Sequence, residues 1–266
     1  MICPRPSPCW RAPLAPEVDS DPWVIWQSAV EQGAQGRYLD AAVRCEQLVA
    51  SGGRWRSLSL STRASHCRQI GDIDAAQSGD EAALECAADD ESRADALIGL
   101  AADAVARGDS AAAAAHHADA GSFAHDWRTR TRWHWVGAEQ ALLLGDFLAA
   151  RDHALEAVSS CSAWSPRHRA KSQIILAAAS ADASYLTDTA VLIEESGWAT
   201  LEWTLALVAG DHAEQVDPDW LAAAWARGVA ATLLIEEQLS SDLAAIWRRH
   251  PGVRRLRAGD AGPWGR

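Results

Sequence analysis

Residues 145–150 read Gly-Asp-Phe-Leu-Ala-Ala, and related segments that begin with glycine occur three more times in the chain. The four glycines are Gly36, Gly71, Gly108 and Gly145, and they are separated by 35, 37 and 37 residues. Alanine lies five residues after each glycine and seven residues before it, and leucine or alanine lies twelve residues after it. A period of this length indicates a repeated structural unit.

Each unit is predicted to be a pair of helices joined at the glycine. In residues 131–144, Trp133, Val136, Ala141 and Leu144 recur at the spacing of one helix face. Glycine adopts the left-handed backbone conformation that ends many helices, and an aspartate that can cap the next helix follows it in three repeats. Small residues at the crossing let two helices approach closely. Because one pair cannot bury its own apolar face, neighbouring pairs are expected to stack.

The composition favours helices throughout. Alanine, the best helix former, is abundant, whereas Phe and Tyr occur only twice each and no apolar–polar alternation typical of strands is found. The 14 tryptophans supply the large apolar areas that alanine lacks. The predicted fold class is therefore all-α.

The Gly-Asp-aromatic-x-x-Ala block of residues 145–150 resembles the middle of the tetratricopeptide repeat, and the alanine columns fall where that family places small residues. The resemblance covers residues 22–162. It implies a right-handed α-solenoid of antiparallel helix pairs, with four pairs in this range. The chain departs from the family at the tryptophan of the first helix, which is replaced by Ile25, Leu60, Leu97 and His134.

The same resemblance implies a concave groove that binds a peptide or a helix of a partner protein. The family pattern places eight residues along this groove: Trp23, Trp26, Ser61, Arg68, Ile98, Arg132, Trp135 and Glu139. The family's clamp for a C-terminal carboxylate uses Lys and Asn at these positions, and neither is found there. Specificity for such a carboxylate is therefore not implied.

The remainder of the chain divides into three further segments. Residues 1–21 are rich in proline and are expected to form a disordered leader. Residues 163–249 are expected to hold degenerate repeats and capping helices, with breaks at Gly210 and Pro218. Residues 250–266 are expected to be a basic flexible tail, either a solvated end or an electrostatic arm.

A second periodic column consists of arginines spaced by 37 residues, namely Arg56, Arg93, Arg130 and Arg167. Each is expected to lie one residue before the first helix of its repeat. The four are therefore predicted to form a basic edge that docks an acidic segment of a partner. The alternative is local pairing with neighbouring acids. Asp89, Asp90 and Glu91 lie near one of these arginines, and Asp126 lies near another.

The stretch from Trp127 to Trp135 is the densest run of aromatic and basic residues. One interpretation is a platform for stacking and anion contacts. The other is that tryptophans at helical spacing belong to the core.

The net charge of −12 argues against a general nucleic-acid binder. The longest apolar stretch, from Leu221 to Ile235, is too short to cross a membrane. The six cysteines form no CxxC pair, and no secretory segment is evident, so a cytoplasmic location is expected.

No catalytic or metal-binding motif was found, and the histidines have no chelating spacing. We therefore expect no catalytic residues, no metal and no cofactor. The principal hypothesis is a protein-interaction scaffold that is not an enzyme. The alternative is a regulatory sensor, in transcription or stress signalling, that binds a small ligand or a regulator. An enzyme of unrecognised type is the third possibility. The sequence leaves the oligomeric state open.

Overall fold

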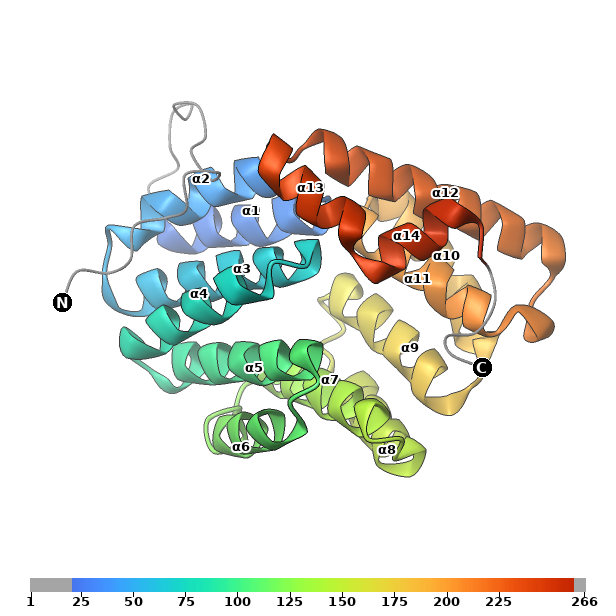
Figure 1. Cartoon of the computed structure of the whole chain (residues 1–266). Helices are drawn as coiled ribbons and strands as arrows, with labels where there is room; N and C mark the ends of the chain where they lie inside the picture. The colour runs from blue at the N-terminus through green and yellow to red at the C-terminus, as the bar shows by residue number, and fades with distance from the viewer. Residues whose placement is uncertain (1–20, 261–266) are drawn as a thin grey trace.

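The computed structural model describes residues 21–260, and this part of the chain is helical without strands (Figure 1). Its helices are α1 (Pro22–Ala34), α2 (Tyr38–Val49), α3 (Gly53–Ile70), α4 (Ile73–Glu85), α5 (Asp90–Arg107), α6 (Ser110–Gly121), α7 (Trp127–Leu143), α8 (Phe147–Ser160), α9 (Pro166–Ser180), η2 (Ala183–Tyr185), α10 (Leu186–Ser196), α11 (Ala199–Asp211), η3 (Ala213–Gln215), α12 (Pro218–Glu237), α13 (Ser241–Arg249) and α14 (Pro251–Ala258). The predicted all-α class is confirmed. None of these helices combines the length and the hydropathy needed to cross a membrane.

The four repeat glycines lie at the turns between paired helices, as predicted. Each has a positive φ, between +72° and +99°, which is the left-handed conformation that glycine adopts without steric cost. The aspartate that follows three of them accepts a hydrogen bond from the backbone three residues later, at Ala75, Ala112 and Ala149. These bonds satisfy N–H groups in the first turn of the second helix.

The small-residue columns lie where the two helices of a pair cross. All four alanines before the glycines and all four after them are at most 1% exposed: Ala29, Ala41, Ala64, Ala76, Ala101, Ala113, Ala138 and Ala150. The third column is equally buried, at Leu48, Ala83, Ala120 and Ala157. These columns are therefore part of the buried interior, which is where close packing of paired helices needs small side chains.

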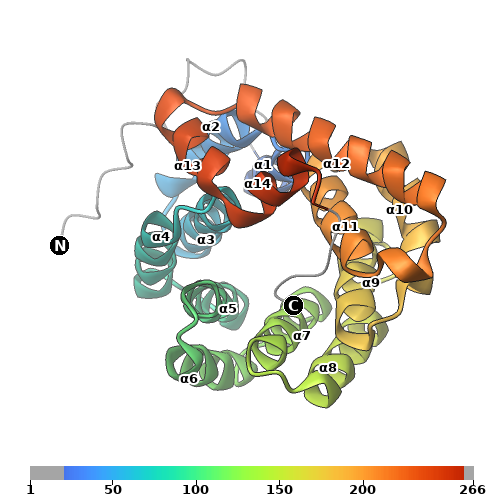
Figure 2. The ribbon, with the colours of Figure 1, turned by 45° about the vertical axis from the view of Figure 1, so that its right-hand side comes forward.

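The odd-numbered helices from α1 to α11 form a closed inner ring. Each contacts the next odd-numbered helix, and α11 contacts α1. Hydrogen bonds contribute to the contact that closes the ring. Trp198 Nε1 donates to Glu31 at 3.1 Å, and Thr200 donates to the carbonyl of Ala34 at 2.9 Å. Figure 2 shows α4, α6 and α8 outside this ring.

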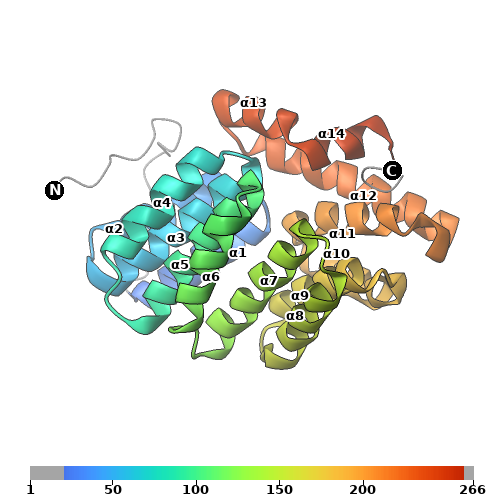
Figure 3. The same ribbon diagram turned by 60° about the horizontal axis from the view of Figure 1, so that its bottom comes forward.

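The last three helices pack against both the early and the late helices of the ring. α12, α13 and α14 gather on one side of the ring (Figure 3), where α13 contacts α3 and α14 contacts α11. One core cluster joins Tyr38 and Ile70 from the first repeats to Trp203, Ile235 and Trp247. The C-terminal helices thus hold the two ends of the ring together.

The predicted tail at residues 250–266 is corrected by this arrangement. Pro251–Ala258 is helix α14, in which Val253 and Leu256 are buried. Arg257 pairs with Glu236 of α12 at 2.5 Å. The basic residues suggested a solvated tail because the acids that neutralise them come from helices earlier in the chain. Residues 261–266, and all but the last residue of the predicted 1–21 leader, lie outside the described part.

Candidate functional site

A cavity of about 370 Å³ lies inside the ring, and each odd-numbered helix from α1 to α11 contributes to its wall. Seven of the eight predicted groove residues line it: Trp26, Ser61, Arg68, Ile98, Arg132, Trp135 and Glu139. The eighth, Trp23, does not line the cavity; it is 41% exposed and packs on Trp26 and Trp55. Because the six helices surround one cavity, these residues share one site.

Arg68 is held on one wall by two buried carboxylates. Its guanidinium lies 2.6 Å from both Asp80 and Asp103, and it donates to the carbonyl of Gly99 at 3.1 Å. Ser61 donates to the other oxygen of Asp80 at 2.8 Å. Burial raises the pKa of Asp80 to about 8, against the opposing effect of Arg68.

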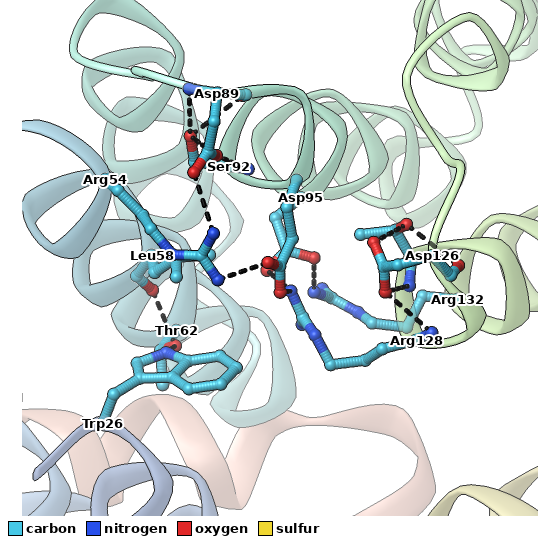
Figure 4. A network of polar contacts seen from close by, with 12 residues as sticks. Trp26, Arg54, Leu58, Thr62, Asp89, Ser92, Asp95, Asp126, Arg128 and Arg132 are labelled. Carbon is cyan, nitrogen blue, oxygen red and sulfur yellow. Dashed lines mark hydrogen bonds and ion pairs between the residues drawn. The ribbon is translucent and has the colours of Figure 1, made fainter. Parts of the chain in front are cut away.

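A second network joins α3, α5 and α7 (Figure 4). Asp95 is 2% exposed and pairs with both Arg128, at 2.8 Å, and Arg132. Glu91 bridges Arg128, at 3.0 Å, to Arg54. The Arg128 guanidinium also lies 4.9 Å from the ring of Trp26. Both cavity arginines from α7 are therefore neutralised by α5.

These bridges join equivalent positions of adjacent repeats. Arg54, Glu91 and Arg128 are spaced by 37 residues, and Asp95 and Arg132 by the same interval. Opposite charges thus alternate at the repeat period. This alternation is visible in the sequence, but the prediction of the groove was not based on it. The alternating charges mark the residues through which the first helix of one repeat pairs with the first helix of the next.

Lys171 and Trp135 occupy the wall between α7 and α9. Lys171 lies 4.4 Å from the ring centre of Trp135 and 3.8 Å from Glu139. The Trp135 indole donates to Ser172 at 2.8 Å, and His168 stacks on it at 5.2 Å. Burial lowers the pKa of His168 to about 2, with Arg167 adding to the effect, so this histidine is neutral at pH 7.

Arg167 also lines the cavity. It forms no ion pair with any residue of the part from 21 to 260, and its buried Nε has no hydrogen-bond acceptor there. Glu31 influences it at longer range, but that carboxylate accepts hydrogen bonds from Trp198 and Gln35. Burial lowers the pKa of Arg167 below its usual range.

The four arginines of the predicted basic edge lie in different environments. Arg93 and Arg130 are exposed, Arg56 and Arg167 are half-buried, and Arg167 also lines the cavity. All four lie inside the first turn of their helices, one to three residues after its start. The acids expected to pair locally act elsewhere, because Asp89 pairs with Arg54 and Asp126 caps α7.

The run from Trp127 to Trp135 is divided between surface and interior. Trp127 is 41% exposed, whereas Trp135 is 6% exposed and Trp133 stacks on His117 at 4.4 Å. Beside this stack, the Nδ1 atoms of His134 and His153 lie 3.1 Å apart. Within the described residues, no three His, Cys, Asp or Glu side chains are grouped so that they could hold a metal ion.

No family model, curated protein or solved structure matches the chain. The likeness to tetratricopeptide repeats therefore rests on the residues quoted above. A function has to be argued from the chemistry of the cavity.

Proposed function

We propose that this protein is a binding protein, not an enzyme, that holds a small anionic ligand in its central cavity. Arg167 is the observation that carries the proposal, because it is the cavity cation without an ion-pair partner in the described residues. Arg167 is half-buried, and a partly desolvated guanidinium gains stability from a counter-ion. A bound anion supplies the missing partner, and a planar one accepts two parallel hydrogen bonds from the same guanidinium.

The size of the cavity suits a small ligand. The cavity holds about 370 Å³, which lies in the range of sites for small molecules. Of the hypotheses drawn from the sequence, a sensor that binds a small ligand is the one that we propose for this site.

The ionisable side chains of the wall do not point to His66 or His168 as proton-transfer groups. Four of the cavity cations, Arg68, Arg128, Arg132 and Lys171, are within 4 Å of carboxylates. Burial lowers the pKa of His66 to about 3 and that of His168 to about 2. Proton transfer near pH 7 is most efficient when the pKa of the acid or base is near 7, so neither histidine suits that task.

We expect at least one small anion to raise the melting temperature of the full chain in a screen of inorganic and organic anions. Arg167→Gln is expected to weaken that binding by about 10- to 100-fold, because it removes a charge-assisted hydrogen-bond donor. The matched control is Arg130→Gln, an exposed arginine of the same column, which should bind like the natural protein. Titration calorimetry measures both affinities. An unchanged affinity of Arg167→Gln would contradict the proposal.

We also propose that residues 22–162 form four units of a right-handed α-solenoid related to tetratricopeptide repeats. The period of the glycines, the buried alanine columns and the ion pairs between equivalent positions support a common unit. The ring closes because α9 and α11 continue the stacking until α11 contacts α1.

A second candidate function, a scaffold for a partner protein, is favoured by exposed apolar side chains at the turn between α7 and α8. Leu144, Phe147 and Leu148 are 60%, 63% and 78% exposed. Clustered exposed apolar residues commonly mark protein-binding surfaces. The exposed Arg93 and Arg130 would suit an acidic partner segment instead.

A pull-down with the full chain at low and high salt separates these two surfaces. If the apolar turn is the docking site, one dominant protein is retained at both salt concentrations and is lost with Leu144→Ser plus Leu148→Ser. The arginines are the docking site if the leucine variant still retains the protein. In that case the protein should be lost at high salt, because salt screens exposed charges. It should also be lost with Arg93→Gln plus Arg130→Gln.

A further inference from the structure

Two histidines lie with their ring nitrogens close together where α7 packs on α8. The Nδ1 atoms of His134 in α7 and His153 in α8 are 3.1 Å apart, and their ring centres are 5.4 Å apart. Neither side chain lines the central cavity. Because the two positions are 19 residues apart and belong to different helices, the sequence shows no chelating spacing between them.

The separation of the two nitrogens suits two ligands of one metal ion. Imidazole nitrogen binds Zn²⁺ at about 2.0–2.1 Å, and two such bonds at an angle of about 90–110° place their nitrogens about 2.9–3.4 Å apart. The observed 3.1 Å lies within this range. The two nitrogens are therefore already at a chelating separation.

Both imidazoles are neutral at pH 7, as metal ligands have to be. Burial lowers the pKa of His134 to about 4, with His153 adding to the effect, and burial also lowers the pKa of His153. Without a metal, one Nδ1–H donates to the other Nδ1. When an ion binds, the donor ring takes its other neutral tautomer, with the proton on Nε2, and both Nδ1 lone pairs become free.

Neighbouring groups hold the two rings in place. Trp133 packs edge-on against both, with ring centres 4.8 Å from His134 and 5.5 Å from His153. The His153 ring also lies on the backbone of α7 at Gly137, where a Cβ atom would come within 2.6 Å of Nδ1. Ligands that are held in position before the ion arrives form a more precise site.

Water is left to complete the coordination shell. Within residues 21–260, no third His, Cys, Asp or Glu side chain is grouped with the pair as a ligand. His117 is the nearest candidate, with its ring 5.6 Å from that of His153, but its Nε2 donates to a backbone carbonyl at 3.0 Å. Both members of the pair are half-buried, so each keeps some contact with solvent.

The surrounding charges and the ligand type indicate the class of ion. Asp152 and Glu156 act on the two histidines and outnumber Arg130, so the surroundings attract a cation. Imidazole suits Zn²⁺, Ni²⁺ and Cu²⁺, whereas Mg²⁺ prefers oxygen ligands. The pair therefore selects late transition metals.

We propose that His134 and His153 chelate one divalent transition-metal ion, such as Zn²⁺ or Ni²⁺, through their Nδ1 atoms, and that the ion joins α7 to α8. The site is separate from the central cavity, so its test does not depend on the proposed function.

Titration calorimetry of the full chain with Zn²⁺ and with Ni²⁺ tests the site. His134→Gln plus His153→Gln removes both ligands and measures the binding that occurs elsewhere in the chain. Relative to this variant, the natural protein is expected to bind one additional ion per chain. Mg²⁺ is expected to show no difference between the two proteins. Equal binding of Zn²⁺ and Ni²⁺ by both proteins would overturn the proposal and leave the pair as a hydrogen bond only.

Single variants test whether the two histidines share one ion. His134→Gln and His153→Gln are each expected to weaken its binding by at least about 10-fold, because one imidazole remains. Gly137→Ala keeps both histidines but places a methyl group where the His153 ring lies, so it should weaken binding as well. His125→Gln, at a side chain 68% exposed, is the control. Unchanged affinity in any of the first three variants would overturn the shared site.

Two further measurements complete the test. Circular dichroism of each variant without metal verifies that it is folded. Nuclear magnetic resonance of the full chain with ¹⁵N-labelled histidine identifies the binding atoms, and Zn²⁺ is expected to bind Nδ1 of His134 and of His153. Binding through the Nε2 atoms instead would contradict the proposed geometry.

Discussion

Asp95→Asn is expected to lower the free energy of unfolding by about 3 kcal/mol, because it leaves two half-buried guanidinium groups without their shared carboxylate. Asp95 is 2% exposed and pairs with Arg128 and Arg132, both of which line the cavity (Figure 4). Glu91 remains beside Arg128, so most of the loss should arise at Arg132. Urea denaturation at pH 7.5 measures the change.

Two further variants test the physical reason for this loss. Asp74 forms an ion pair with Arg107, and its carboxylate is 89% exposed. Asp74→Asn makes the same chemical change there and should lower the free energy of unfolding by less than about 0.5 kcal/mol. Adding Arg132→Met to Asp95→Asn removes the unpaired cation and should recover part of the stability. A loss of equal size in Asp74→Asn and Asp95→Asn would contradict the role of burial.

Acidification is expected to destabilise the protein through His66 and His168. Burial lowers the pKa of these side chains to about 3 and about 2, whereas an unfolded histidine titrates near 6.5. Between those values the unfolded chain binds more protons than the folded one, so stability falls as the pH falls below about 6.5. From pH 7.5 to 5.5 each histidine contributes a loss of about 1.4 kcal/mol, or about 3 kcal/mol for both.

The measurement compares the natural protein with His66→Phe plus His168→Phe by urea denaturation at both pH values. The loss on acidification should be about 3 kcal/mol smaller in the double variant. Asp80 acts in the opposite direction, since its raised pKa favours the folded state as the pH falls, but its effect cancels in this comparison. His125→Gln, at a side chain 68% exposed, is the control. A double variant with the same acid sensitivity as the natural protein would contradict the assignment.

The candidate site was predictable in part. Arg68, Ile98, Arg132, Trp135 and Glu139 were placed on a binding surface because they lie at fixed positions in the repeats, and all of them line the cavity. Trp203 and His250 lie beyond the last clear repeat, where no register exists to place them. Arg167 was predicted as part of an exposed edge, but exposure depends on which helices surround it, and the repeat period carries no information about that.

The sequence by itself determined the helices, the turns and the crossings. Gly71 and Asp72 end one helix and cap the next through bonds to residues fewer than six positions away, and Ala64 and Ala76 are buried because every repeat needs small side chains there. Only the tertiary structure decided that the stack closes, with Thr200 bonded to Ala34 across 166 positions of sequence. Closure depends on small rotations between successive helix pairs, which add up around the ring and are set by packing. For that reason the predicted groove residues line a cavity within a ring, and Arg167 lies in its wall.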